Sequence, residues 1–114
     1  MEYTRLGRTG LEVSRICFGT MSFGKKTEKR PWVLGLEEAR PMFRAAWEGG
    51  INFYDTANVY AEGTSEEVTG VLIKELAPRE EIILATKVFN PMRPGKPNGM
   101  GLSRQAILPE IDQS

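Results

Sequence analysis

The apolar positions along the chain alternate between short continuous runs and longer stretches with a helical repeat. The runs that predict buried strands are residues 16–20, 51–55 and 81–88. The stretches whose apolar residues recur every three or four positions, and so predict helices, are residues 36–47, residues 64–77 and the segment after Ser103. Strands that alternate with helices in this way favour a parallel sheet with right-handed crossovers.

The segments outside this alternation read as a hairpin and two loops. Residues 3–6 and 11–14 are short extended runs on either side of a Gly-Arg-Thr-Gly sequence, which predicts a β-hairpin. Residues 23–35 are polar and predict a long loop. Residues 90–101 contain three prolines and three glycines, and they predict a second loop.

Glycine and proline mark the expected ends of the first two helices. Gly49 and Gly50 should close the first helix, because glycine accepts the left-handed backbone that ends a helix. Pro41 is expected near the start of that helix, since proline breaks a helix interior. Residues 64–67 should form the entry of the second helix, with a capping residue followed by acids, and Pro78 should end it. The predicted apolar stripe of the second helix is Val68, Val71, Leu72 and Leu76.

The last predicted helix carries a conflicting signal. Ser103 is a suitable capping residue, and Ala106, Ile107 and Ile111 would share one side of the helix. Pro109 lies too deep for a first-turn position and is expected to kink or interrupt the helix.

Composition and charge exclude several function classes. The 114 residues have a net charge of zero, which gives no reason to expect a nucleic-acid or membrane surface. Cys17 is the only cysteine, so no intrachain disulfide forms; it is expected in the core, and a cytoplasmic setting is favoured. The chain has no histidine, and with one cysteine it predicts no metal site. No signal sequence or apolar span of about 20 residues is visible.

Three polar side chains are expected to meet at the ends of two neighbouring strands. Asp55 ends the run 51–55, and Lys87 closes the run 81–88. If these strands are parallel neighbours, both side chains emerge at the same edge of the sheet, with Tyr60 on the loop beside them. An ordinary ion pair next to a surface tyrosine is the simpler alternative. The same spacing also suits acid–base chemistry, because a carboxylate can hold an ammonium charged beside a phenol.

Both an open doubly wound sheet and a closed barrel fit the alternation. The glycine fingerprint of dinucleotide-binding open sheets is absent after the first predicted strand. Thr20, Asp55 and Lys87 stand at successive strand ends, which favours the barrel, whose sites lie on that face.

Several ordered segments resemble the aldo-keto reductase family, especially its bacterial and fungal branch that acts on small aldehydes and alcohols with NADP. The matching segments are LGRTGLEVS (6–14), FGTMSFG (18–24), GINFYDTANVY (50–60), GTSEEVTG (63–70), ATKVF (85–89) and GLSR (101–104). They follow one another along the whole chain, so together they are much more specific than any one of them.

The resemblance implies the N-terminal portion of a TIM (β/α)8 barrel, a fold of about 250 residues. Residues 1–14 would form the hairpin that closes the bottom of the barrel, and residues 15–114 its first three strand–helix units. The family's catalytic histidine and most of its cofactor-binding groups would lie beyond Ser114. The chain is therefore expected to be a truncated reductase that is inactive alone.

The resemblance also implies roles for individual residues. Tyr60 would protonate the substrate oxygen, and Lys87 and Asp55 would support it; a free phenol ionises only near pH 10, so the ammonium is needed. The implied cofactor is NADP, near Gly19, Thr20, Met21 and Asp55. The implied partner is a small carbonyl substrate, near Met21, Val59 and Phe89, although packing explains these three residues equally well.

Two further hypotheses remain open. The chain is also similar to channel-associated members of the family, so it could be an NADPH-binding or interaction subunit without catalysis. A histidine after the fourth strand of the longer protein would favour catalysis, and a replacement there would favour the subunit. Three strands also leave unpaired edges and an uncovered face, which predicts self-association.

Overall fold

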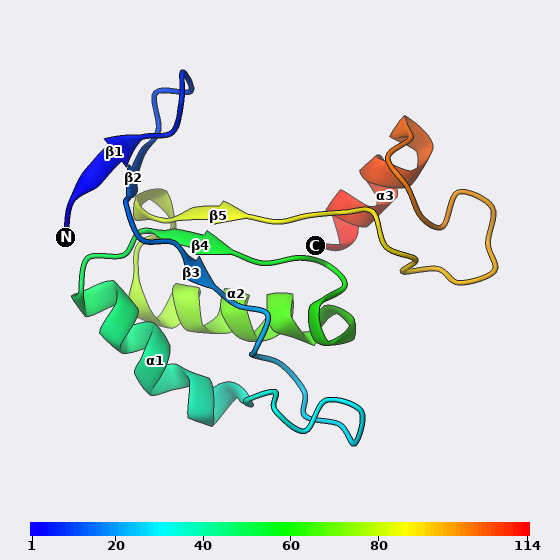
Figure 1. Ribbon diagram of the computed structural model, residues 1–114, viewed down its shortest axis with the longest axis horizontal. Helices are drawn as coiled ribbons and strands as arrows, with labels where there is room; N and C mark the ends of the chain where they lie inside the picture. Colours follow the sequence, from blue (N-terminus) through cyan, green and yellow to red (C-terminus); the bar gives the residue numbers. More distant parts are fainter.

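The computed structural model describes residues 1–114, which is the whole sequence. The chain begins with a hairpin of β1 (Tyr3–Arg5) and β2 (Glu12–Ser14), in which Tyr3 lies opposite Ser14 in antiparallel pairing. The predicted hairpin is confirmed, and Figure 1 shows it at the end of the molecule farthest from the C-terminal helix.

A parallel sheet of three short strands forms the centre of the fold. Its strands are β3 (Phe18–Gly19), β4 (Phe53–Asp55) and β5 (Ile83–Ala85), in the order β3-β4-β5. The parallel pairing predicted from the strand–helix alternation is confirmed. The strands are shorter than predicted. Of the expected strand at 81–88, Glu81 instead ends a 3-10 turn at Arg79–Glu81, and only Ile83–Ala85 pairs in the sheet.

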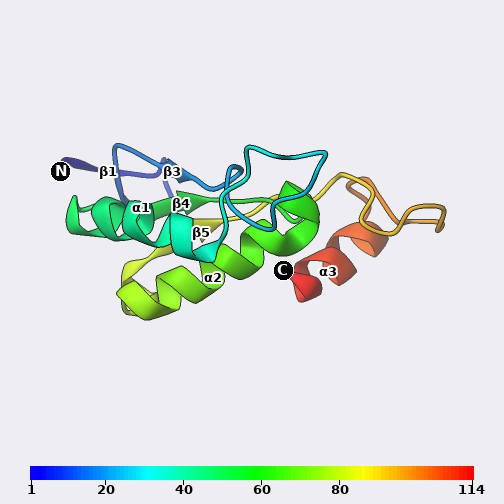
Figure 2. The same cartoon turned by 90° about the horizontal axis from the view of Figure 1, so that it is seen from below.

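Two helices cover one face of this sheet. They are α1 (Leu36–Glu48) and α2 (Thr64–Leu76), which both follow a strand and run back beneath the sheet. Figure 2 shows them on the same side, with the opposite side of the sheet left without helices. No helix in the chain combines the length and the apolar character that crossing a membrane requires.

An aromatic cluster joins the sheet to α1. The ring of Phe43 on α1 meets Phe18 edge to face at 5.0 Å and stacks on Tyr54 at 5.9 Å between centroids. Phe23 completes the cluster at 5.2 Å from Phe43. Leu72 of α2 is fully buried in the same core. Edge-to-face and offset stacking are favourable geometries for aromatic rings, so this cluster fixes β3 and β4 on the helical layer.

The other face of the sheet is free, and it carries the polar side chains of interest. Side chains alternate along a strand, so burial of Tyr54 against the helices turns its neighbour Asp55 to the free face. Gly19 and Ala85 flank Asp55 in the strand register. Cys17 is exposed, which corrects its expected place in the core: nothing covers this side of the sheet.

Helix α1 tolerates a proline in its interior. Pro41 is the sixth residue of the helix, not a first-turn residue, so the prediction for its position was wrong. Burial of Ala39, Phe43 and Ala46 stabilises the helix on both sides of the missing hydrogen bond. The end of the helix is as predicted: Gly50 is left-handed, with φ of 86°, and Ile51 donates its N–H to the Ala46 carbonyl at 2.9 Å.

Helix α2 begins in the predicted segment but faces differently than predicted. Gly63, with φ of 93°, takes the capping position, and Thr64 is the first helical residue. Val71 is exposed, which contradicts the predicted stripe. The buried positions are Ser65, Thr69, Leu72 and Ile73. The apolar pattern does not identify this face because two of its buried residues are polar. Ser65 is one of them, and its hydroxyl bonds to the Thr20 carbonyl just after β3. Helix α2 ends before Pro78, as predicted.

The C-terminal helix α3 (Arg104–Gln113) is continuous through Pro109. The expected interruption is therefore wrong. Ser103 caps the helix as predicted, since its Oγ accepts the Ala106 N–H at 3.2 Å. Of the predicted apolar side, Ala106 is buried and Ile107 is half-buried, but Ile111 is exposed and Glu110 is buried in its place. The residues preceding the helix form the predicted loop, closed by a 2.8 Å hydrogen bond from the Gly101 N–H to the Phe89 carbonyl.

Candidate active site

The structure brings Asp55, Tyr60 and Lys87 together around one ammonium group. The Lys87 Nζ donates to Asp55 Oδ2 at 2.7 Å and to Tyr60 Oη at 3.2 Å. A third hydrogen bond runs to the carbonyl of Thr56 at 2.7 Å. All three donor positions of the ammonium are therefore used, which fixes its direction as well as its place.

The parallel register explains why these residues meet. Asp55 is the last residue of β4, beside Ala85 at the end of β5, and Lys87 follows two positions later. Backbone hydrogen bonds continue past the strand ends: Thr56 donates to Ala85 and Asn58 donates to Lys87, at 2.9 and 3.2 Å. The carboxyl ends of neighbouring parallel strands thus lie at one edge, as the sequence predicted.

The site is electrostatically matched but open to solvent. The Lys87 side chain is 49% exposed and the Asp55 side chain 35%. Partial burial lowers the pKa of Lys87, but hydrogen bonds and charge interactions with Asp55 and Tyr60 outweigh burial, so the pKa is raised overall. The ammonium also lies 4.8 Å from the centroid of the Tyr60 ring. Lys87 is therefore held in its charged form beside the phenol oxygen.

This environment predicts a pH-dependent loss of stability. Because the folded-state pKa of Lys87 is raised, its contribution is complete below its ordinary value of 10.5 and is lost as the pH rises through the folded-state value. Burial also raises the pKa of Tyr54 to about 12, so the unfolded state, which releases this proton first, gains stability in the same range. Urea unfolding measures the free energy of unfolding at about pH 8 and at about pH 11. This free energy should decrease less between the two pH values in Lys87→Met than in the unsubstituted chain. Tyr54→Phe separates the second contribution, and equal decreases in Lys87→Met and the unsubstituted chain would contradict the assignment.

A left-handed turn holds Tyr60 in place. Tyr60 begins the 3-10 turn Tyr60–Gly63, in which Ala61 and Glu62 have φ of 48° and 59°. Positive φ is unfavourable for residues with a side chain, so neighbouring contacts must maintain the turn. Thr64 Oγ1 donates to the Ala61 carbonyl at 2.7 Å, and Arg30 pairs with Glu62 at 2.8 Å.

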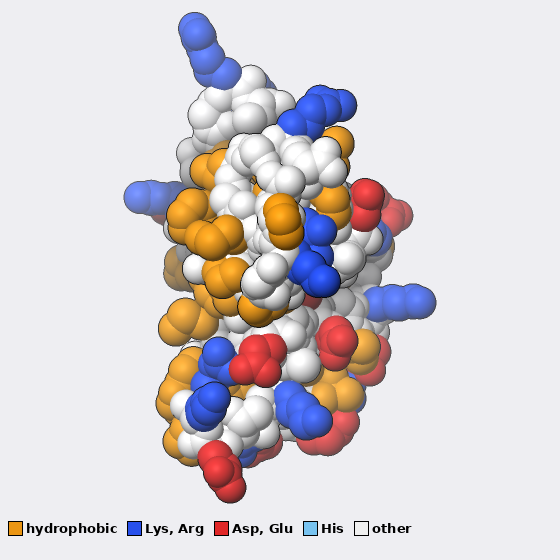
Figure 3. Space-filling view, turned by 90° about the vertical axis from the view of Figure 1, so that its right-hand side faces the viewer, with side chains coloured by type: hydrophobic (Ala, Val, Ile, Leu, Met, Phe, Trp, Pro, Cys, Tyr) orange, Lys and Arg blue, Asp and Glu red, His pale blue; other side chains and the backbone are white.

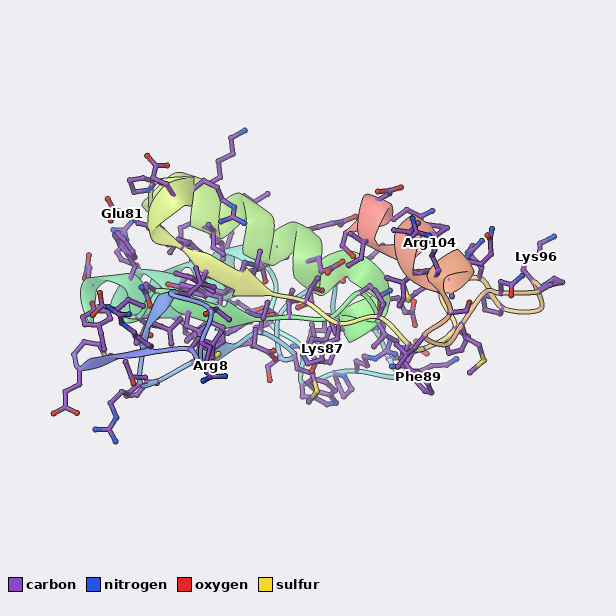
Figure 4. The ribbon with its side chains drawn as sticks, turned by 90° about the horizontal axis from the view of Figure 1, so that it is seen from above. Arg8, Glu81, Lys87, Phe89, Lys96 and Arg104 are labelled. Carbon is purple, nitrogen blue, oxygen red and sulfur yellow. The ribbon has the colours of Figure 1, made fainter.

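The other residues with predicted roles surround this centre unequally. Gly19 is exposed beside Asp55, and Met21 is exposed at the end of β3. Thr20 is fully buried, and its hydroxyl donates to the Asp55 carbonyl at 3.1 Å, so its side chain has a structural contact. Val59 is half-buried next to Tyr60, and Phe89 is 53% exposed. Figure 4 shows Lys87 and Phe89 on the same segment, which leads from β5 toward the loop of Lys96.

A buried polar network behind the site was not predicted. Glu110 of α3 is buried, accepts from Asn58 Nδ2 at 3.2 Å and pairs with Arg93 Nε at 3.1 Å. Asn58 lies between Asp55 and Tyr60 in the chain, so the network ties α3 and its preceding loop to the site segment. No spacing in the sequence points to it, because its three members lie in separate segments.

The hollows of the surface lie away from the ammonium group. A recess of about 600 Å³ lies beside the hairpin, near Tyr3 and Trp47. Another, of about 450 Å³, lies between α2 and α3 and is lined by Asn58, Glu110 and other residues of these helices. Neither recess includes Asp55, Tyr60 or Lys87. Within this chain the site is an open surface, not an enclosed pocket.

Comparison with known proteins finds similarity to one family along most of the chain. A profile of the Aldo/keto reductase family matches residues 15–114. Versiconal hemiacetal acetate reductase of Aspergillus parasiticus is 37% identical over 131 residues, which cover 100% of this chain and 38% of that protein. An uncharacterized oxidoreductase of Bacillus subtilis is 42% identical over 122 residues, covering 100% of this chain and 35% of that protein. A probable voltage-gated potassium channel subunit beta of Arabidopsis thaliana is 40% identical over 110 residues, which cover 95% of this chain and 31% of that protein.

Solved structures agree with these matches. A thermostable aldo-keto reductase solved with the inhibitor epalrestat superposes with a TM-score of 0.74 at 29% identity, over 99% of this chain and 37% of that chain. An aldo-keto reductase of Bacillus halodurans in its holo form has a TM-score of 0.67 at 38% identity, over 84% of this chain and 28% of that chain. The chain thus spans between about a quarter and two fifths of the length of these relatives, and its fold is the N-terminal portion of their (β/α)8 barrel. Its fold, its ordered segments and the profile match together show that this chain belongs to the aldo/keto reductase family.

Proposed function

We propose that Asp55, Tyr60 and Lys87 are catalytic residues of an NADP-dependent reductase that converts aldehyde or ketone carbonyls to alcohols. The observation that carries this proposal is the single ammonium that bonds to both Asp55 and Tyr60 at 2.7 and 3.2 Å. A phenol beside a fixed ammonium is suited to give a proton to an oxygen on which negative charge develops.

Each residue has a distinct task in this proposal. Tyr60 donates its hydroxyl proton to the carbonyl oxygen of the substrate. Lys87 stabilises the negative charge that then remains on the Tyr60 oxygen, because its ammonium is already hydrogen-bonded there. Asp55 keeps Lys87 charged and aimed, which the raised pKa of Lys87 supports.

The residues present fit the nicotinamide end of NADP. No heavy atom lies within 4 Å of the place that a Cβ on Gly19 would occupy, so a flat ring can approach the backbone there. Asp55, which is partly exposed, pairs with Gly19 in the strand register, Met21 is exposed two residues after Gly19, and buried Thr20 bonds to the Asp55 carbonyl. When bound, NADPH supplies a hydride to the carbonyl carbon.

The same free face supplies the proposed substrate contacts. Met21 and Phe89 are more than half exposed and follow Gly19 and Lys87 by two residues each, and Val59 is half-buried beside Tyr60. Such a surface suits a small carbonyl compound with an apolar substituent. We also propose a cytoplasmic setting, which a single free cysteine favours.

We expect residues 1–114 alone to be inactive. The chain contains no histidine to donate a hydrogen bond to the substrate oxygen, and its site is open to water. The purified chain with NADPH and nitrobenzaldehyde should therefore show no enzyme-dependent loss of NADPH absorbance. Turnover that Tyr60→Phe abolishes would refute the expected inactivity while supporting the assigned site.

A second candidate function is an NADPH-binding or interaction subunit without catalysis. The 40% identity to a probable potassium channel subunit beta of Arabidopsis thaliana favours this candidate. The two candidate functions can be distinguished in a longer protein that contains this chain and the rest of the barrel. A histidine after its fourth strand, with turnover that depends on Tyr60, supports the reductase; binding of NADPH without turnover supports the subunit.

We further propose that the isolated chain self-associates. Strands β3 and β5 each have an unpaired edge, and the free face of the sheet is uncovered. Apolar side chains also gather along one side of the face that Figure 3 shows. In the segment before α3, Phe89, Met100 and Leu102 are more than half exposed. Light scattering should give a mass above 12.8 kDa that rises with concentration. A single monomeric species at all concentrations would count against this proposal.

A further inference from the structure

The first turn of α2 carries three consecutive side chains that bond to four residues outside the helix. Thr64 Oγ1 donates to the Ala61 carbonyl at 2.7 Å and accepts the Lys25 N–H at 2.8 Å. Ser65 Oγ donates to the Thr20 carbonyl at 2.7 Å. Glu66 Oε1 accepts the Thr86 hydroxyl at 2.5 Å. None of these bonds is needed to form the helix itself.

Three of these bonds, those to Ala61, Thr20 and Thr86, each end next to a different residue of the candidate site. Ala61 directly follows Tyr60, and Thr86 directly precedes Lys87. Thr20 donates both its N–H and its hydroxyl to the Asp55 carbonyl, at 2.9 and 3.1 Å. One helical turn therefore reaches the neighbourhoods of all three site residues, one side chain for each.

We infer that Thr64, Ser65 and Glu66 are positioning residues, and that together they hold Tyr60, Asp55 and Lys87 in mutual contact. The inference deepens the proposed function and rests on it, since it assigns support to the residues proposed to be catalytic.

Burial and backbone geometry explain why such support is required. Ser65 and Thr20 are both fully buried, so their hydrogen bond is shielded from water. Ala61 and Glu62 have left-handed backbone that needs external contacts to persist. Lys87 lies beyond the last paired residue of β5, where a single backbone hydrogen bond, from the Asn58 N–H to the Lys87 carbonyl at 3.2 Å, continues the ladder. The helical turn supplies a rigid reference for all three segments.

The rate at which Lys87 is chemically modified tests this positioning without any measurement of enzyme turnover. Acetic anhydride modifies neutral amines, so hydrogen bonds that keep Lys87 charged slow its acetylation, which mass spectrometry measures for each lysine separately. In the full chain, Thr86→Val and Ser65→Ala should each raise the Lys87 rate about twofold or more relative to Lys96, because the contacts of Lys87 with Asp55 and Tyr60 loosen. Lys96 lies in the exposed loop before α3 and serves as the internal reference.

A neighbouring residue provides the matched control. Glu67 lies in the same helical turn and is exposed, so Glu67→Ala should leave the Lys87 rate unchanged, whereas Glu66→Ala should raise it. Circular dichroism establishes that each variant is folded. If Ser65→Ala does not fold, Thr86→Val still tests the inference, because it keeps the side-chain shape at a half-buried position. Equal Lys87 rates in folded Thr86→Val, Glu66→Ala and Glu67→Ala overturn the inference. That result would leave the proposed reductase function untouched, because the labelling involves neither cofactor nor substrate.

Discussion

Tyr60→Phe is expected to lower turnover by about 10²–10⁴-fold when residues 1–114 replace the matching segment of a complete reductase. The thermostable aldo-keto reductase with a TM-score of 0.74 is a suitable recipient, because its alignment covers 99% of this chain. The substitution removes the proton that the proposed mechanism delivers to the substrate oxygen and keeps the ring that packs beside Lys87. Turnover is measured by NADPH consumption with an aldehyde that the recipient reduces.

A matched substitution separates chemistry from packing in this chimera. Tyr54→Phe also removes one phenol hydroxyl, but Tyr54 lies in the aromatic core facing the helices, so turnover should stay near that of the unsubstituted chimera. Lys87→Met should lower turnover, as Tyr60→Phe does, because it removes the ammonium that bonds to the phenol. Equal turnover in Tyr60→Phe and Tyr54→Phe would contradict the proposed role of Tyr60 as the proton donor.

Gly24→Ala is expected to destabilise the chain by about 2–4 kcal/mol, through overpacking and a strained backbone. Gly24 has φ of 141°, and a Cβ there would meet the Ala61 Cβ and the Thr64 Oγ1, both at 2.7 Å. These atoms belong to the turn that follows Tyr60 and to the first turn of α2. The clash therefore acts directly on the segment that places Tyr60, and urea unfolding measures its cost.

Gly10→Ala is the control that separates backbone strain from the clash. Gly10 also has positive φ, at 81°, but no heavy atom lies within 4 Å of the place of its Cβ. It should therefore show only the backbone part of the loss, about 1–2 kcal/mol. A loss for Gly24→Ala no larger than that for Gly10→Ala would show that the contact with Ala61 and Thr64 is unimportant.

The parts of the fold that the sequence predicted are those in which one local signal decides. Alternating strands and helices predicted the parallel sheet, and Gly50 closes α1 because only a left-handed residue allows that turn. The sequence also predicted that Asp55 and Lys87 lie close together, because neighbouring parallel strands end at the same edge of the sheet, whatever the path of the helix between them. The structure shows that they meet, and their catalytic role remains a proposal.

The parts that could not be predicted depend on contacts between distant segments. Val71 looked like a core residue, yet α2 turns its hydroxyl-bearing residues inward because Ser65 bonds to Thr20, 45 positions away. Cys17 looked buried, but burial there requires a cover on the free face of the sheet, which these residues do not supply. Pro109 looked disruptive, yet α3 runs through it, held at Glu110 by Asn58 and Arg93. Apolar periodicity contains none of this information.

The contact between Lys87 and Tyr60 can be measured most directly by nuclear magnetic resonance on the isotope-labelled chain. Because the Lys87 Nζ lies 4.8 Å from the centroid of the Tyr60 ring, the neighbouring methylene protons should show a nuclear Overhauser effect to the ring and an upfield shift relative to those of Lys96. Both signals should disappear in Tyr60→Leu. Lys87 methylene protons that match those of Lys96 and show no effect to the ring would contradict the site on which the reductase proposal rests.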